Sequence, residues 1–183
     1  MLILDIPAIE AFDENTNEFI SISPTSLHME HSLVSVSKWE EKWHKPFLSP
    51  LKEHEKTDEE MMDYIRCMTI TKNVDENLFK YMPPEYLMKI NEYIQDRRTA
   101  TWFNKQETTN KNREITTSEL IYYWMIKLNI PVEFQKWHLN RLMTLIEIFS
   151  IKDAPPKKVS KSELARQRSA LNAARLAKYH TKG

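Results

Sequence analysis

Apolar and polar residues alternate in two short segments near the N-terminus, which predicts two β-strands. Residues 2–6 and residues 18–23 each place apolar side chains at alternate positions. Residues 13–17 between them are Asp, Glu, Asn and Thr, and both Asp and Asn form turns and tolerate the left-handed conformation. We therefore expect a hairpin or a pair of adjacent strands. Residues 26–36 fit either a third strand or the approach to a helix.

Helical spacing replaces this alternation further along. Trp39 and Trp43 lie four positions apart, which places both rings on one helical face, and Pro46 follows as a terminator. Thr57 before Asp58 is typical of a helix N-cap, and Pro84 is typical of a first helical position. The expected buried stripes of these two later helices are Met61, Tyr64, Ile65 and Met68, and Leu87, Ile90, Tyr93 and Ile94.

The second half of the chain predicts an exposed loop and two more helices. Residues 101–113 are polar and read as the loop. Thr116 and Glu119 form a Thr-x-x-Glu capping box ahead of the apolar run 120–126, which favours a helix apolar on every side in the middle of the domain. A strand is the alternative for so short a run. Residues 133–149 predict one helix with Phe134, Trp137, Leu142, Leu145, Ile146 and Phe149 on one side.

Charge divides the chain into two parts. The 26 basic and 26 acidic side chains cancel overall, but residues 152–183 carry nine basic and two acidic residues, so residues 1–151 carry a net charge of −7. A Pro-Pro-Lys-Lys sequence at 155–158 marks a linker. A capping box at Ser160 and several alanines favour a helix from Leu164 to Tyr179. We expect an acidic globular body followed by a basic, mobile arm that a partner orders.

The predicted fold class is therefore α+β and mainly helical. A strand-rich element at 1–36 leads into a helical region at 37–151, and the basic arm at 152–183 follows the linker. The longest apolar run is far shorter than the roughly 18 residues that a membrane span needs, so we expect no membrane association.

Glycine usage narrows the possible functions. Among 183 residues there is one glycine, Gly183. A P-loop, a dinucleotide-binding GxGxxG and a nucleophile elbow each need backbone positions that glycine fills, so the composition argues against these enzymes.

Candidate metal and thiol chemistry is sparse. The single cysteine, Cys67, lies in an apolar stripe and reads as a buried structural thiol. His28, Glu30 and His31 form the nearest thing to a metal motif, but no second short-spaced pair completes the three or four ligands of a zinc site. We expect no metal and no cofactor.

Two Trp–His pairs are candidates for partner binding. They are Trp39 and Trp43 with His44, and Trp137 with His138. Tryptophan in a small domain packs in the core or at an interface. A general base could be drawn from either histidine with Glu40, Glu41 or Glu133, but the sequence supplies no activated nucleophile. Core, interface and catalytic interpretations stay open, and we do not expect an enzyme.

The basic arm offers a second candidate surface. Its candidate residues are Arg166, Arg168, Arg175 and Lys178. Alanines dilute these charges and only Tyr179 adds an aromatic ring, unlike a nucleic-acid-binding segment. Docking to an acidic protein surface, simple solvation and nucleic-acid binding are the three interpretations.

Several stretches together resemble the tail assembly chaperones of long-tailed, siphovirus-type phages and prophages of Gram-positive bacteria. They are EHSLVSVSKWE at 30–40, WHKPFL at 43–48, DYIRCMT at 63–69, TATWF at 99–103, ITTSELIYYWM at 115–125, KWHLNRL at 136–142, ALNAAR at 170–175 and TKG at 181–183. The likeness covers nearly the full chain, and no single motif in it is chemically diagnostic.

The resemblance implies a non-catalytic role in virion assembly. Such chaperones bind the tape measure protein, keep it soluble and help major tail protein subunits polymerise around it. The implied partners are the tape measure protein, with the major tail protein as a second candidate, and further copies of the chain. The implied location is the host bacterial cytoplasm during assembly, not the mature virion. A permanent structural component of the neck or tail and a nucleic-acid-binding regulator are the alternatives.

Overall fold

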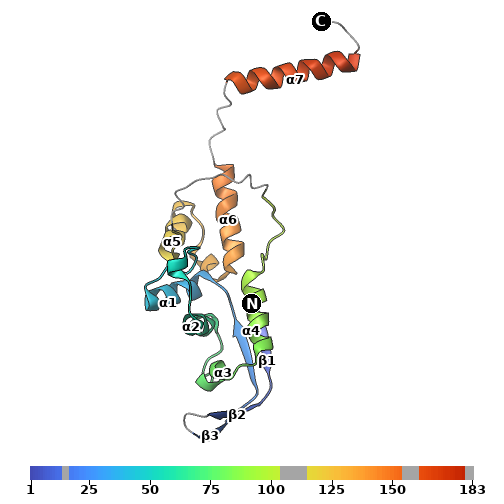
Figure 1. Cartoon of the computed structure of the whole chain (residues 1–183). Helices are drawn as coiled ribbons and strands as arrows, with labels where there is room; N and C mark the ends of the chain where they lie inside the picture. Colours follow the sequence, from blue (N-terminus) through green and yellow to red (C-terminus); the bar gives the residue numbers. More distant parts are fainter. Residues whose placement is uncertain (14–16, 104–114, 154–160, 180–183) are drawn as a thin grey trace. The chain divides into compact units, whose positions relative to one another are not determined.

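The computed structural model describes residues 1–13, 17–103, 115–153 and 161–179 (Figure 1). The chain forms two compact units, Met1–Phe149 and Ser150–Gly183. The first unit begins with strands and continues with helices, and the fold is α+β and mainly helical, as predicted. No helix among the described residues is long and apolar enough to cross a membrane.

Within the described ranges, four short strands form two antiparallel pairs. Their bounds are β1 Leu2–Ile6, β2 Ile9–Asp13, β3 Glu18–Ile22 and β4 Thr25–Met29. β1 pairs with β4, and β2 pairs with β3. The first and third strands are therefore not paired with each other, and the prediction missed β2. Residues 26–36, ambiguous in sequence, contain the end of β4 and the beginning of a helix.

Burial explains why β1 selects β4 as its partner. Leu4 lies opposite Leu27, and Ile6 lies opposite Thr25. Leu4, Ile6, Leu27 and Met29 are all buried, so one face of this pair belongs to the core. Because side chains alternate between faces, a shift of the register by one residue would carry these residues into solvent.

Side-chain caps set where the first two long helices begin. Helix α1 spans Leu33–Trp43, and Ser32 and Ser35 form its capping box. It ends at His44, whose φ of 51° is left-handed. Helix α2 spans Asp58–Met68, and the predicted cap Thr57 forms a capping box with Glu60.

The remaining helices of the first unit include both confirmed and corrected predictions. Their bounds are η1 Lys52–His54, α3 Glu76–Lys80, α4 Pro84–Gln95, α5 Ser118–Lys127, η2 Val132–Lys136 and α6 Leu139–Lys152. Pro84 is the first residue of α4, as predicted. The short η1 and α3 were not predicted. The predicted loop at 101–113 lies outside the described residues except for its first three positions.

Two helix predictions were wrong. The single helix expected at 133–149 is a 3₁₀ turn, η2, and a separate helix, α6. Helix α5 is not buried on every side, because Ile126 is 77% exposed and Tyr123 is 54% exposed. Only one face of α5, with Ile121 and Met125, joins the core.

The core is a single cluster that draws on the strands and on the helices from α1 to α6. Its largest fully buried side chains are Trp39, Tyr64, Ile6, Ile22, Leu27, Met29, Leu33, Met68, Leu78, Ile90, Ile121 and Leu139. Cys67 is half-buried against this cluster, and burial raises the pKa of its thiol.

The second unit contains helix α7, Lys161–Tyr179, which includes the segment predicted to be helical in the arm. The linker residues 154–160 lie outside the described part of the chain.

Candidate functional site

Both tryptophans of α1 bind α2. The Trp39 indole N–H donates to the Glu60 carbonyl oxygen at 2.7 Å, and the Trp43 indole N–H donates to Asp63 Oδ2 at 2.9 Å. Trp39 is fully buried and Trp43 is half-buried. In the folded chain Trp39 therefore serves the core, and only part of Trp43 is open to a partner.

Two lysines complete the seam between α1 and α2. Lys42 Nζ lies 2.5 Å from Asp63 Oδ1, and Lys45 forms an ion pair with Glu60. The Lys45 side chain, and then the Thr57 backbone N–H, lower the pKa of Glu60. Burial acts to raise the pKa of Asp63, but the bonds from Lys42 and Trp43 outweigh it and the net pKa is lowered. Both carboxyl groups are therefore ionised at neutral pH.

The Glu40 carboxylate is committed to two backbone groups. Its Oε1 accepts the Phe47 N–H at 2.7 Å, and its Oε2 accepts the Ser118 N–H at 2.7 Å. Glu40 is buried, whereas His44 is exposed at the end of α1. The sequence left a catalytic pair of His44 with Glu40 as one interpretation. Among the described residues no hydrogen bond joins the His44 ring to the Glu40 carboxylate.

A buried polar cluster joins the end of β4 to α2, α4 and the start of α6. His31 Nδ1 is hydrogen-bonded to the Tyr64 hydroxyl, and the His31 ring lies edge-on to the His138 ring with centroids 5.1 Å apart. His138 Nε2 is 2.9 Å from the Tyr93 carbonyl oxygen. A carbonyl oxygen only accepts hydrogen bonds, so the ring proton of His138 lies on Nε2. The buried Nδ1 of His138 has no hydrogen-bond partner among the described residues.

Burial keeps both rings of this cluster neutral. Burial lowers the pKa of His31 to about 3, with a further contribution from His138. Burial also lowers the pKa of His138, against the opposing effects of the Tyr93 carbonyl and of Glu30. Glu30 accepts the Tyr93 hydroxyl at 2.5 Å and lies 2.6 Å from the amino group of Met1. The hydrogen bonds and the ion pair of this cluster thus connect the N-terminus and the end of β4 with α2, α4 and the start of α6.

The motif at His28, Glu30 and His31 does not form a metal site. His28 is half-exposed in β4, and its backbone N–H donates to Thr71. His31 is 2% exposed and bonded to Tyr64. Within the described residues no group of three or more His, Cys, Asp and Glu side chains is placed to hold a metal ion.

Trp137 forms a small stack next to the core. Its ring lies on the Phe134 ring at a centroid distance of 3.9 Å with 15° between the planes, and the Arg141 guanidinium lies 4.1 Å from the Trp137 ring centroid. Trp137 is half-buried and His138 is buried. Of this predicted pair, only Trp137 has surface to offer a partner.

Helix α7 carries the predicted basic residues on exposed positions. Arg166, Arg168, Arg175 and Lys178 are all exposed. Positions 168, 171, 175 and 178 follow a 3-4-3 spacing, so Arg168, Leu171, Arg175 and Lys178 share one side of the helix. We call these four residues the basic stripe. Leu171 within it is 58% exposed.

Comparisons with known proteins do not assign this chain to a family. No protein-family model, no curated protein and no solved structure matches the chain. The sequence did not predict that Glu40 is buried and bonded to the Ser118 backbone, because no local pattern indicates a partner 78 positions away.

Proposed function

We propose that this protein is a phage tail assembly chaperone. In this role it binds the tape measure protein, keeps it soluble and promotes polymerisation of the tail tube, without catalysis. The sequence segments that resemble this family support the proposal, and the basic stripe of α7 is the observation that carries it.

The basic stripe fits a helical protein partner. Leu171 is an apolar side chain, 58% exposed, on the 19-residue helix α7, and Arg168, Arg175 and Lys178 lie on the same side of this helix. A helix that presents an apolar residue between acidic residues would bury Leu171 and pair with the three cations. A tape measure protein is long and helix-rich, so it can present such a surface repeatedly.

The test is capture of the tape measure protein encoded in the same genome. Co-expression with the full-length chain should keep the tape measure protein soluble, and affinity capture at low and high salt should recover it. Arg175→Glu should reduce capture by about fivefold or more, since it reverses a charge in the contact. Arg166→Glu is the matched control, because residue 166 lies on the other side of α7 from the stripe.

Four outcomes would contradict the proposal. The tape measure protein could aggregate in the presence of the chaperone, or Arg166→Glu could weaken capture as much as Arg175→Glu. Mass spectrometry of purified particles could also recover the chain in stoichiometric amounts, which would make it a structural tail component. Capture that disappears after nuclease treatment would point to nucleic acid instead.

A further inference from the structure

The β1–β4 pair has one edge closed by the chain and one edge open. The outer edge of β4 is covered by residues 69–71, because the Ile70 N–H donates to the His28 carbonyl oxygen at 2.8 Å and the His28 N–H donates to Thr71 Oγ1 at 2.8 Å. No described residue covers the outer edge of β1 in the same way. On its outer edge the only hydrogen bond within the described residues joins the Tyr86 hydroxyl to the Asp5 carbonyl oxygen, at 3.3 Å.

That bond also shows which backbone groups of β1 are free to pair. In an antiparallel pair, alternate residues direct both N–H and C=O toward the partner strand. The Asp5 carbonyl points away from β4, so the backbone N–H and C=O of Ile3, two residues earlier, point away from β4 as well. The backbone groups of Leu2, Leu4 and Ile6 point toward β4 and pair with it. The free edge therefore offers the N–H and C=O of Ile3 and the N–H of Asp5.

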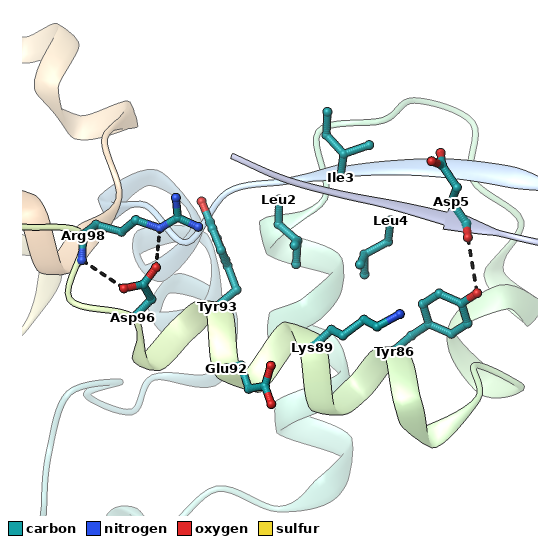
Figure 2. A pocket seen from close by; sticks show the side chains of 10 residues that line it. All are labelled: Leu2, Ile3, Leu4, Asp5, Tyr86, Lys89, Glu92, Tyr93, Asp96 and Arg98. Carbon is teal, nitrogen blue, oxygen red and sulfur yellow. Dashed lines mark hydrogen bonds and ion pairs between the residues drawn. The ribbon is translucent and has the colours of Figure 1, made fainter.

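A groove of about 690 Å³ lies between this edge and helix α4. Figure 2 shows Leu2 and Leu4 pointing toward α4, and Ile3 pointing away from it. Tyr86 stands near Asp5 at one end, and the ion pair of Arg98 with Asp96, 2.7 Å long, lies at the other end. The helix thus flanks the open edge of the strand and leaves it accessible.

We propose that this groove binds an extended segment of another protein, which adds to β1 as a third strand of the sheet. This surface is distinct from the basic stripe of α7, and the inference does not rest on the proposed function. An added strand lies about 4.8 Å from β1 and pairs with Ile3 through its backbone. It satisfies the free groups of an edge that is otherwise exposed to unwanted pairing.

Charge in the groove identifies the side chains of the segment. Lys89 runs between α4 and β1, and it forms no ion pair with any described residue. Arg98 is already paired with Asp96, and the Glu92 side chain points away from the strand. Acidic side chains on the α4 side of the added strand would pair with Lys89. Apolar side chains on its other side would lie next to Ile3, which is 50% exposed.

Helix α4 argues against a second copy of this chain as the occupant. Two β1 strands pairing through their free edges would be related by a two-fold axis perpendicular to the sheet. That axis would bring both copies of α4 to the same face, where each flanks its own β1. The basic arm at 152–183, with nine basic and two acidic residues, does not offer the alternating acidic side chains that Lys89 selects.

The test uses the full-length protein and the capped peptide acetyl-Glu-Val-Glu-Val-Glu-amide, with NMR of the backbone amides. Binding should shift the Ile3 and Asp5 amide signals and slow their hydrogen exchange. The valines lie on the Ile3 side and direct their N–H groups toward β1, so N-methylation of both valines should abolish binding. A peptide with Lys in place of Glu should bind at least about fivefold more weakly.

A protein variant tests the charge preference separately. Lys89→Glu should reverse the charge preference, so that the Lys peptide binds better than the Glu peptide. Lys72→Glu is the control, because Lys72 is exposed and lies outside the groove, and it should leave the preference unchanged. The proposal is overturned if the N-methylated peptide binds equally or if the Ile3 amide does not respond. It is also overturned if Ile3 and Asp5 are already protected in the free protein, whether by a second copy or by the chain itself.

Discussion

The Glu40 carboxylate accepts the Ser118 backbone N–H at 2.7 Å, although the two residues are 78 positions apart in sequence. Ser118 is the first residue of α5, where backbone N–H groups lack partners within the helix. The other oxygen of Glu40 accepts the Phe47 N–H at 2.7 Å. One side chain of α1 thus fixes both the segment that follows α1 and the beginning of α5.

We predict that Glu40→Ala destabilises the protein by about 3 kcal/mol. Two buried backbone N–H groups lose their acceptor, and each costs about 1–3 kcal/mol when it is left unpaired. Glu40→Gln should recover only part of this loss, because its amide NH₂ cannot accept the second N–H. Denaturant unfolding followed by tryptophan fluorescence measures the change.

Glu41 provides the matched control for Glu40. It is the next residue on α1 and it is exposed, so Glu41→Ala should change the free energy of unfolding by less than about 0.5 kcal/mol. Equal effects at the two positions would show that the bonds of Glu40 do not stabilise the fold.

We predict that acid destabilises the protein below the ordinary pKa of histidine. Folded His31 stays neutral down to about pH 3, whereas His31 in the unfolded chain binds a proton near pH 6.5. Between these values the unfolded state holds more protons, so the free energy of unfolding falls by up to about 1.4 kcal/mol for each pH unit of acidification. The lowered pKa of His138 acts in the same direction.

Unfolding free energies measured between about pH 7 and pH 5 isolate this effect, because Glu60 and Asp63 lose their stabilising contribution only near or below their ordinary pKa values of 4.5 and 3.8. His31→Gln should flatten the slope, whatever it does to the absolute stability. His44→Asn, at an exposed histidine, is the control. An unchanged slope in His31→Gln would refute the assignment.

The two tryptophans of α1 should differ in their contributions to stability. Trp39→Phe should cost about 2 kcal/mol or more, because it removes volume from a filled core together with a buried hydrogen bond. Trp43→Phe should cost less than about 1 kcal/mol, because Trp43 is half-buried and Asp63 keeps its contact with Lys42. Thermal unfolding followed by circular dichroism compares the two variants, and equal losses would contradict the assigned roles.

Local signals in the sequence were sufficient to predict several helix boundaries. Thr57 and Pro84 act within a few residues of where they stand, so their effects on α2 and α4 could be predicted without the rest of the chain. The fold class followed in the same way, from alternation near the N-terminus and helical spacing after it.

Tertiary hydrogen bonds account for the prediction that failed at 133–149. The Leu139 N–H donates to the His31 carbonyl oxygen at 2.7 Å, and His138 forms a β-bridge with Ser32. These contacts favour an extended backbone between η2 and α6, although the apolar spacing there is helical. Their partners lie more than 100 positions earlier, which no local pattern reveals.

The candidate surfaces were predicted only in part, because local patterns in the sequence do not reveal contacts with distant segments. Exposure of the basic residues in α7 follows from a helix with few large apolar side chains. The burial of Trp39 and His138 depends on which segments cover them. The open edge of β1 could not be predicted at all, because the sequence favoured a different partner strand.

The sequence prediction and the structure place the beginning of α5 one residue apart. The sequence favoured Thr116 as the capping residue, through a Thr-x-x-Glu box with Glu119, but the structure places the cap at Thr117, whose side chain accepts the Leu120 N–H. Thr117→Ala should therefore cost about 1 kcal/mol, the usual loss for a removed N-cap, and Thr116→Ala should cost less than about 0.5 kcal/mol. Both threonines are half-buried, so their burial does not bias the comparison. Denaturant unfolding of the two variants decides the register. A larger loss at Thr116 would place the start of α5 one residue earlier.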